Sequence, residues 1–233
     1  MKNCIVLSGQ YRTFDKTWPQ IKEFMDTNNM DAYCHLWGVA DEEENSWQFH
    51  QVKDRLKPQR IHQEPYSDKL ETRFRDMETR IRAANPKGPN ADKLAANASM
   101  NYSRKFAFDL IDKEYDNVVY CRYDIGFRDI FRFDNIVSIV TPHEEAYNLI
   151  SDIFAIMPME FAKPYFLFDR YEELNSTPYD EKFIEYLRFR KYPEHDIKTH
   201  VDNRYCPHML LMRSLLEGEA PWCAEHIPVY LQR

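Results

Sequence analysis

Three short polar clusters in this sequence each follow an apolar run, and each contains side chains suited to binding a phosphorylated ligand. The first is Ser8-Gly9-Gln10-Tyr11-Arg12, which follows the apolar residues 4–7. Gly9 lets the backbone approach a ligand closely, and the guanidinium of Arg12 can contact two phosphate oxygens at once. The same residues would suit an ordinary turn between a strand and a helix, so the sequence leaves both interpretations open.

The other two clusters add a carboxylate and an aromatic ring. Arg122-Tyr123-Asp124 follows the buried-strand pattern at 118–121. At the end of such a strand, Asp124 is placed to hold a divalent cation or sugar hydroxyls, and Arg122 to neutralise a diphosphate. The alternative is an ion pair that only closes the strand end. Trp37, in the cluster at 35–38, either offers its face to a nucleobase or packs in the core.

Asp152 and His208 are candidates for binding a second substrate. Asp152 lies inside the apolar run 150–154. An ionised carboxylate is costly to bury alone, so this residue is the leading candidate for a general base on the acceptor side. The alternative is an acid in solvent at the start of a strand. His208 opens an expected helix, where it would approach an anionic group, although a lone histidine is more often structural.

Composition and spacing exclude several classes of function. The 233 residues are 43% hydrophobic, enough for a substantial core, and carry a net charge of -7. That charge disfavours a broad nucleic-acid-binding surface. The five glycines include no pair with the spacing of a phosphate loop, and the eight histidines include no HxxxH or HExxH zinc pattern. No GxSxG elbow of a serine hydrolase is present.

Hydropathy and cysteine usage predict where the protein works. No stretch approaches the roughly 20 apolar residues of a membrane span, so none is expected. The first apolar run, of about five residues, is too short for the core of a signal peptide. The five cysteines are scattered without a CxxC pair. We therefore expect reduced thiols and a cytoplasmic location, in the host cell if the source is viral.

The elements that must position these clusters alternate between strands and helices. This alternation predicts a single α/β domain over 1–233 with a mainly parallel central sheet flanked by helices. Residues 41–90 are expected to form an excursion of loop and helix. Ligands bind such sheets outside the carboxyl ends of the strands, which is where the three clusters lie. Strands are predicted at 3–7, 31–37, 60–63, 118–121, 136–140, 151–157 and 226–233, and helices at 18–25, 94–113, 161–174, 179–190 and 207–216.

Four segments, in order along the chain, carry a resemblance to a known family. They are IVLSGQYRTFDKTWPQI followed by DAYCHLW, then YDNVVYCRYDIGF, SDIFAIMP and the closing IPVYLQR. They resemble a family of GT-A-type glycosyltransferases of large DNA viruses and bacteria that act on surface polysaccharides or glycans. The second segment stands where other GT-A enzymes carry an Asp-x-Asp motif. Together the segments span nearly the whole chain.

The resemblance implies a GT-A-like, Rossmann-like domain that transfers sugar from a UDP- or GDP-sugar donor to a glycan acceptor. Asp124 would take the role of the last Asp of Asp-x-Asp and bind Mn²⁺ or Mg²⁺, or the donor itself. Arg122 replaces the first Asp, so a guanidinium is the alternative to a metal for offsetting leaving-group charge. The donor would lie against Ser8, Gly9, Gln10, Arg12, Trp37, Ser99, Tyr102, Ser103 and Arg122.

The hypothesis from sequence is therefore a glycosyltransferase with Asp124 and Asp152 as catalytic residues and with Asp152 and His208 on the acceptor side. Where relatives have Pro-Glu before the last helix, this chain has Pro-His at 207–208. One alternative is a catalytically weak protein that binds a nucleotide or sugar in the same cleft. Another is a nucleotidyltransferase, which would need a second carboxylate beside Asp124; only Asp129 is a near neighbour.

Overall fold

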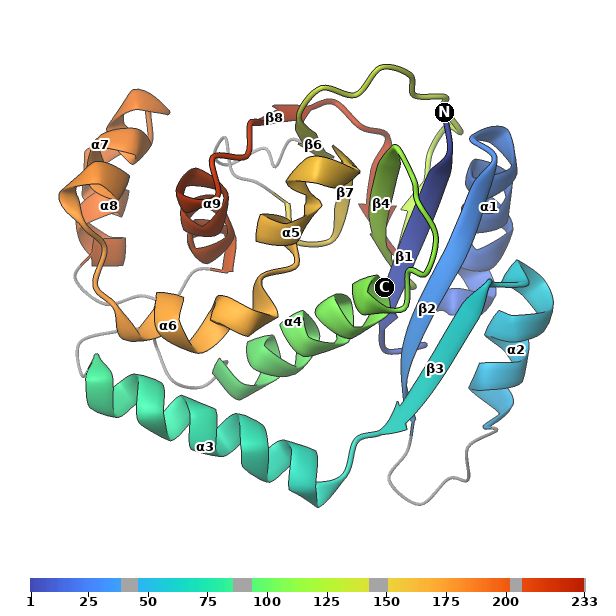
Figure 1. Cartoon of the computed structure of the whole chain (residues 1–233), viewed down its shortest axis with the longest axis horizontal. Helices are drawn as coiled ribbons and strands as arrows, with labels where there is room; N and C mark the ends of the chain where they lie inside the picture. Colours follow the sequence, from blue (N-terminus) through green and yellow to red (C-terminus); the bar gives the residue numbers. More distant parts are fainter. Residues whose placement is uncertain (39–45, 86–93, 143–150, 202–206, 233) are drawn as a thin grey trace.

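A mixed seven-stranded sheet organises the chain (Figure 1). The computed structural model describes residues 1–38, 46–85, 94–142, 151–201 and 207–232. The strand order is β3-β2-β1-β4-β7-β6-β8; neighbours are parallel except that β7 is antiparallel to both β4 and β6. This confirms the predicted α/β class with a mainly parallel sheet. The strands are β1 Asn3–Gly9, β2 Met30–Gly38, β3 Arg60–Pro65, β4 Asn117–Arg122, β6 Ile139–Pro142, β7 Phe154–Pro158 and β8 Trp222–Glu225.

Helices cover both faces of the sheet, which is why its central strands are continuous apolar runs. Alternate residues of β1 belong to two separate core clusters: Cys4 and Val6 to one, Ile5 and Leu7 to the other. The first cluster packs against α3, α4 and the helices from α5 to α9, and the second against α1 and α2. The helices are α1 Phe14–Thr27, α2 Trp47–Leu56, α3 Asp68–Ala84, α4 Leu94–Asp109, α5 Ala162–Tyr165, α6 Tyr171–Ser176, α7 Glu181–Phe189, α8 Glu194–Val201 and α9 Pro207–Glu217.

The chain end forms a second, two-stranded sheet next to the carboxyl end of β4. Strand β5, Ile125–Phe127, pairs antiparallel with β9, Val229–Leu231. The expected final strand therefore exists, but it joins β5 and not the main sheet. The backbone N–H of Gln232 donates to the carbonyl of Asp124 at 2.8 Å. The tail is thus fixed beside one of the predicted site residues.

Several predicted elements have different bounds. The expected helix over 161–174 is broken into the short 3-10 turns Met159–Phe161 and Leu167–Arg170 with α5 and α6 around them. The range 41–90, expected as an excursion, contributes the edge strand β3 between α2 and α3; its residues 41–45 and 86–90 lie outside the described part. Among the described helices, none is long and apolar enough to cross a membrane.

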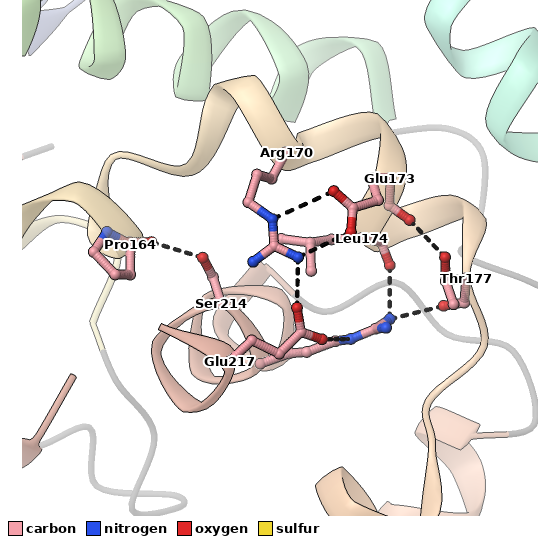
Figure 2. Close-up of polar contacts among 8 residues, drawn as sticks. Pro164, Arg170, Glu173, Leu174, Thr177, Ser214 and Glu217 are labelled. Carbon is pink, nitrogen blue, oxygen red and sulfur yellow. Dashed lines mark hydrogen bonds and ion pairs between the residues drawn. The ribbon is translucent and has the colours of Figure 1, made fainter. Parts of the chain in front are cut away.

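A buried arginine links α6 to α9. Nη1 of Arg213, on α9, donates to the carbonyls of Leu174 and Thr177 at 3.0 and 2.8 Å, and its Nε donates to Glu217 at 2.8 Å. Figure 2 shows Glu217 also meeting Arg170, whose Nη2 lies 2.5 Å from its carboxylate. These bonds satisfy carbonyls at the end of α6 that have no partner within the helix. They connect the helices that follow β7.

Candidate functional site

The carboxyl ends of β1, β2 and β4 open into one pocket of about 670 Å³. Eight of the predicted donor-site residues line it, so the structure brings together clusters that are far apart in the sequence. They are Ser8, Gly9, Gln10, Arg12, Trp37, Ser99, Arg122 and Asp124. The lining also includes Tyr11 and Gly38, which belong to two of the predicted clusters. Its other residues were not singled out from the sequence, namely Gln48, Tyr66, Ala96, Asn97, Met100 and Tyr120.

The turn from β1 to α1 has an unusual backbone. Gly9 has φ +115°, and Arg12 has φ +37°, in the left-handed region that side chains other than glycine seldom occupy. Backbone strain of this kind concentrates at functional sites. The turn directs Arg12 toward the pocket, where its Nε donates to Oε1 of Gln10 at 2.8 Å.

Arg122 and Asp124 form a bidentate ion pair at the end of β4. Nε of Arg122 donates to Oδ1 of Asp124 at 2.9 Å, and Nη2 donates to Oδ2 at 2.6 Å. Arg12 approaches the same carboxylate, with Nη1 at 3.7 Å from Oδ2. Asp124 is only 4% exposed. Burial works against the charge of Arg122, but the hydrogen bonds to Asp124 raise its pKa above the ordinary value. The guanidinium of Arg122 is therefore charged at neutral pH.

Tyr120 separates this pair from a second, fully buried guanidinium. Its hydroxyl accepts from Oγ of Ser8 at 3.4 Å, and its ring lies 5.4 Å from the guanidinium carbon of Arg104, on α4. Arg104 also lies 4.8 Å from the ring of Tyr165, and its Nε and Nη1 have no hydrogen-bond partner among the residues that the structure describes. Burial raises the pKa of Tyr120, against the charges of Arg104 and Arg122, so its hydroxyl stays protonated.

Aromatic side chains form the other end of the pocket, over β2. The ring of Trp37 stacks on Tyr102 at 5.8 Å and meets the ring of Tyr66 edge to face at 5.3 Å. On α2, Oε1 of Gln48 is buried and has no hydrogen-bond partner within the described part of the chain. Its carbonyl oxygen is an acceptor that a bound molecule can satisfy. This end of the pocket therefore offers flat apolar faces and an open acceptor.

Two predicted donor-site residues do not line the pocket. Tyr102 lies behind Trp37, and its hydroxyl bonds to Glu64 at 3.4 Å. Ser103 is completely buried one helical turn beyond Ser99, where its Oγ lies 2.7 Å from Nδ1 of His35. Four residues turn an α-helix by about 400°, so Ser103 faces the same side of α4 as Ser99, but it lies a turn further along the helix, where His35 covers it. Contact of these two residues with a donor stays a prediction.

His35 is a buried neutral base beneath this wall. Its Nε2 lies 3.5 Å from Oε2 of Glu64, and neither atom has a hydrogen-bond partner. Burial lowers the pKa of His35, although the Glu64 carboxylate opposes this shift. The imidazole is therefore uncharged at neutral pH, and it supports the wall through Trp37, whose ring lies 5.0 Å away.

The two acceptor-side candidates lie in different places. Asp152 is half-buried just before β7, and the carbonyl of Ile153 accepts the backbone N–H of Arg122 at 3.3 Å. The charge of Asp152 also helps to raise the pKa of Arg122. This contribution is smaller than those of Asp124 and Tyr120. Asp152 thus lies beside the arginine end of the pocket. His208 lies in the first turn of α9 and does not line the pocket.

The residues present do not fit a Mn²⁺ or Mg²⁺ site. These ions require several oxygen ligands, and both oxygens of Asp124 accept hydrogen bonds from Arg122. Within the described ranges, no three His, Cys, Asp or Glu side chains gather as ligands. The only charges that meet Asp124 there are the guanidiniums of Arg12 and Arg122.

Tyr120 and Arg104 are two of the site residues that were not predicted from the sequence. Tyr120 lies within an apolar strand run and was indistinguishable from a core residue. Arg104 carried a usable signal, since it stands three residues from both Asn101 and Ala107, which are buried positions on α4. A basic residue at that spacing indicates a charge inside the protein.

No protein-family model and no curated protein matches this sequence. Among solved structures, the chain is similar to the apo form of mouse xyloside xylosyltransferase 1, with 8% identity, a TM-score of 0.42, and coverage of 97% of this chain and 85% of that one. It is also similar to the glycosyltransferase GlyE of Streptococcus pneumoniae TIGR4, with 12% identity and a TM-score of 0.41. That match covers 97% of this chain and 45% of GlyE, so this chain spans less than half of that protein. A third similar structure is a nucleoside-diphosphate-sugar pyrophosphorylase from Vibrio cholerae RC9, with 10% identity, a TM-score of 0.35, and coverage of 98% and 94%.

Proposed function

We propose that this protein is a glycosyltransferase that moves a hexose or pentose from a UDP- or GDP-sugar to a hydroxyl of a glycan. The observation that carries the proposal is the pocket itself, which joins an aromatic end to an arginine end across three strand termini. A nucleoside diphosphate has the matching order of parts, with a flat base at one end and two phosphates at the other.

The donor would lie along the edge of the sheet. The base would pack against Trp37 and Tyr66, with Oε1 of Gln48 accepting a hydrogen bond from the base or the ribose. The turn at Gly9 would pass under the ribose, and the diphosphate would lie against Arg12 and Arg122. The sugar would then point past Asp124 toward β7.

The reaction would use these groups as follows. The acceptor oxygen forms a bond to the anomeric carbon while the bond from that carbon to the diphosphate oxygen breaks. The electron pair of the broken bond stays on the diphosphate, and the guanidiniums of Arg12 and Arg122 stabilise the added charge. In a reaction with inversion, the acceptor proton passes to the carboxylate of Asp152, which lies beside Arg122.

A sugar of the acceptor glycan distant from its reacting hydroxyl would lie beside the first turn of α2. Trp47 begins this helix, is 57% exposed, and meets the ring of Tyr11 edge to face at 5.4 Å. Tyr11 lines the pocket, so the indole lies at its rim. An exposed aromatic face beside a polar site suits the apolar face of a sugar ring.

A nucleotidyltransferase finds less support in the pocket. Such an enzyme would need a second carboxylate beside Asp124, and the groups that meet Asp124 are arginines. Asp129, the near neighbour in sequence, is exposed and does not line the pocket. A protein that binds nucleotide sugars without turning them over would use the same contacts, so turnover is what separates it from the enzyme.

Binding of nucleoside diphosphates tests the site. The melting temperature should rise with UDP or GDP, since a ligand that binds only the folded state stabilises it by mass action. At a concentration about 100 times Kd the stabilisation is about 2.7 kcal/mol. A Trp37→Ala variant should lose most of the shift, and a Trp222→Ala variant, altered at a distant strand, should keep it. If no nucleoside diphosphate shifts the wild type, the donor site is wrongly assigned.

A further inference from the structure

The arginine end of the pocket contains guanidinium groups that can offset the charge of a diphosphate. Asp124 occupies only one edge of the Arg122 guanidinium, through Nε and Nη2. The N–H groups on Nη1 meet no acceptor among the described residues, and the side chain is 22% exposed. A guanidinium held along one edge presents its other edge in a fixed orientation, which suits bidentate contact with phosphate oxygens.

A second guanidinium stands beside the first. Nη1 of Arg12 lies 3.7 Å from the Asp124 carboxylate, and the Arg12 side chain is 56% exposed. Its left-handed backbone and the bond from Nε to Gln10 direct it toward the pocket. Two arginines thus share one carboxylate, which leaves an excess positive charge facing the ligand.

A third positive charge lies behind the wall formed by Tyr120. Arg104 is 1% exposed, and two of its nitrogens have no hydrogen-bond partner among the described residues. A buried guanidinium that forms no ion pair with a described residue is costly, and an anion nearby offsets that cost. Three arginines here stand against two carboxylates, Asp124 and Asp152, so the field at this end of the pocket is positive. It favours a diphosphate and opposes a divalent cation.

Asp124 is in turn a poor ligand for a metal ion. The carboxylate is buried, and both of its oxygens already accept charge-assisted hydrogen bonds. A cation could bind there only by displacing Arg122, which would leave that guanidinium half-buried without its partner.

We propose that this protein binds the diphosphate of its donor through Arg122 and Arg12 without a divalent cation, and that Asp124 is a positioning residue for Arg122. This inference rests on the proposed function, because it concerns the diphosphate of the same donor. When the bond to the anomeric carbon breaks, its electron pair stays on the diphosphate oxygen, and N–H groups of the two arginines stabilise that charge. No co-reactant is required.

Calorimetric titration with UDP and with GDP, in EDTA and in Mn²⁺, tests the proposal on the wild type alone. The Kd should differ by less than about twofold between the two buffers. Binding that appears only with Mn²⁺ would overturn the metal-free site and leave the proposed function standing. Absence of binding in both buffers would overturn both.

Single substitutions test which residues bind the diphosphate. Arg122→Lys keeps one charge but loses the fork, so binding in EDTA should weaken about 10- to 100-fold. Arg122→Asp creates an Asp-x-Asp pair with Asp124; it should bind in EDTA no better than Arg122→Lys and should gain affinity with Mn²⁺. Asp124→Asn should weaken binding and leave it equal in both buffers. The matched control is Arg80→Lys, which should bind as the wild type does. Arg80 lies on α3 and forms an exposed ion pair with Glu172 of α6. If Arg122→Lys binds as tightly as that control, Arg122 does not hold the diphosphate.

Discussion

At the scale of single residues, Arg12 holds a backbone conformation that favours glycine. Its φ of +37° costs a residue with a Cβ roughly 1–2 kcal/mol, whereas glycine adopts it freely. Arg12→Gly should therefore be more stable than Arg12→Ala by about 0.5–1 kcal/mol, the reverse of the usual order. Urea denaturation measures the difference. Both variants should lose nucleotide affinity to the same extent. A less stable glycine variant would show that the turn is not strained at this residue.

His35 makes stability depend on pH. Burial lowers its pKa in the folded state, while the unfolded chain has the ordinary value near 6.5. Below about pH 6.5 the unfolded state binds the proton first, so this contribution is complete above that pH and is lost as the pH falls. The loss is at most about 1.4 kcal/mol per pH unit for one group.

Urea midpoints at pH 7.5 and pH 5.5 test this dependence. The wild type should be less stable at the lower pH, and His35→Gln should lose that part of the difference. His226→Gln, at an exposed histidine, should behave as the wild type does. An unchanged pH dependence in His35→Gln would mean that another group takes up the proton.

At the scale of elements, the end of α9 packs closely against α5. A Cβ on Gly218 would overlap the ring of Pro164, whose carbonyl accepts from Ser214 at 2.8 Å (Figure 2). Gly218→Ala should lower the free energy of unfolding by about 1–3 kcal/mol, as overpacking does. Adding Pro164→Ala should recover part of the loss. Nucleotide affinity should not change, since this contact does not line the pocket. Full stability of Gly218→Ala would show that the two helices separate without cost.

The first turn of α2 presents Trp47 at the pocket rim. Ser46 caps the start of this helix, because its Oγ accepts the backbone N–H of Phe49 at 3.2 Å. If a sugar ring stacks on this indole, Trp47→Ala should raise KM for a glycan acceptor about three- to tenfold and leave the Kd of nucleoside diphosphates unchanged. The assay uses whichever oligosaccharide of a panel supports transfer. Phe189→Ala, at an exposed aromatic on α7, is the control. Equal KM values in the two variants would remove Trp47 from the acceptor site.

The elements that the sequence predicted well are those whose pattern is set locally. β1, β2 and β4 are buried on both faces, so their apolar runs are unbroken. β5 and β8 have three and four residues, and their pairing depends on partners far along the chain. No local pattern marks such strands. Which side chains of α4 line the pocket also depends on tertiary packing, which places Tyr102 behind Trp37 and buries Ser103 against His35.

At the scale of the whole molecule, an acidic chain encloses a pocket with a local excess of arginine. The net charge of -7 is compatible with a local basic site, because Arg12, Arg104 and Arg122 come from a turn, a helix and a strand that are far apart in the sequence. The strand-end clusters could be predicted to meet because parallel neighbours end at the same edge. The ion pair between Arg122 and Asp124 was one of the two interpretations that the sequence left open. That Arg104 is buried behind Tyr120 depends on side-chain packing, which the sequence pattern does not encode.

The most direct test of the central claim is turnover of UDP- and GDP-sugars by the purified protein with a panel of oligosaccharides. Release of nucleoside diphosphate and the mass of the glycans are both followed. The account predicts that one class of donor is consumed, that a glycan gains the mass of one sugar, and that Arg122→Lys slows both. Donors that bind and stay intact would contradict it and favour a binding protein. Formation of a nucleotide sugar from a nucleoside triphosphate would contradict it in favour of a nucleotidyltransferase.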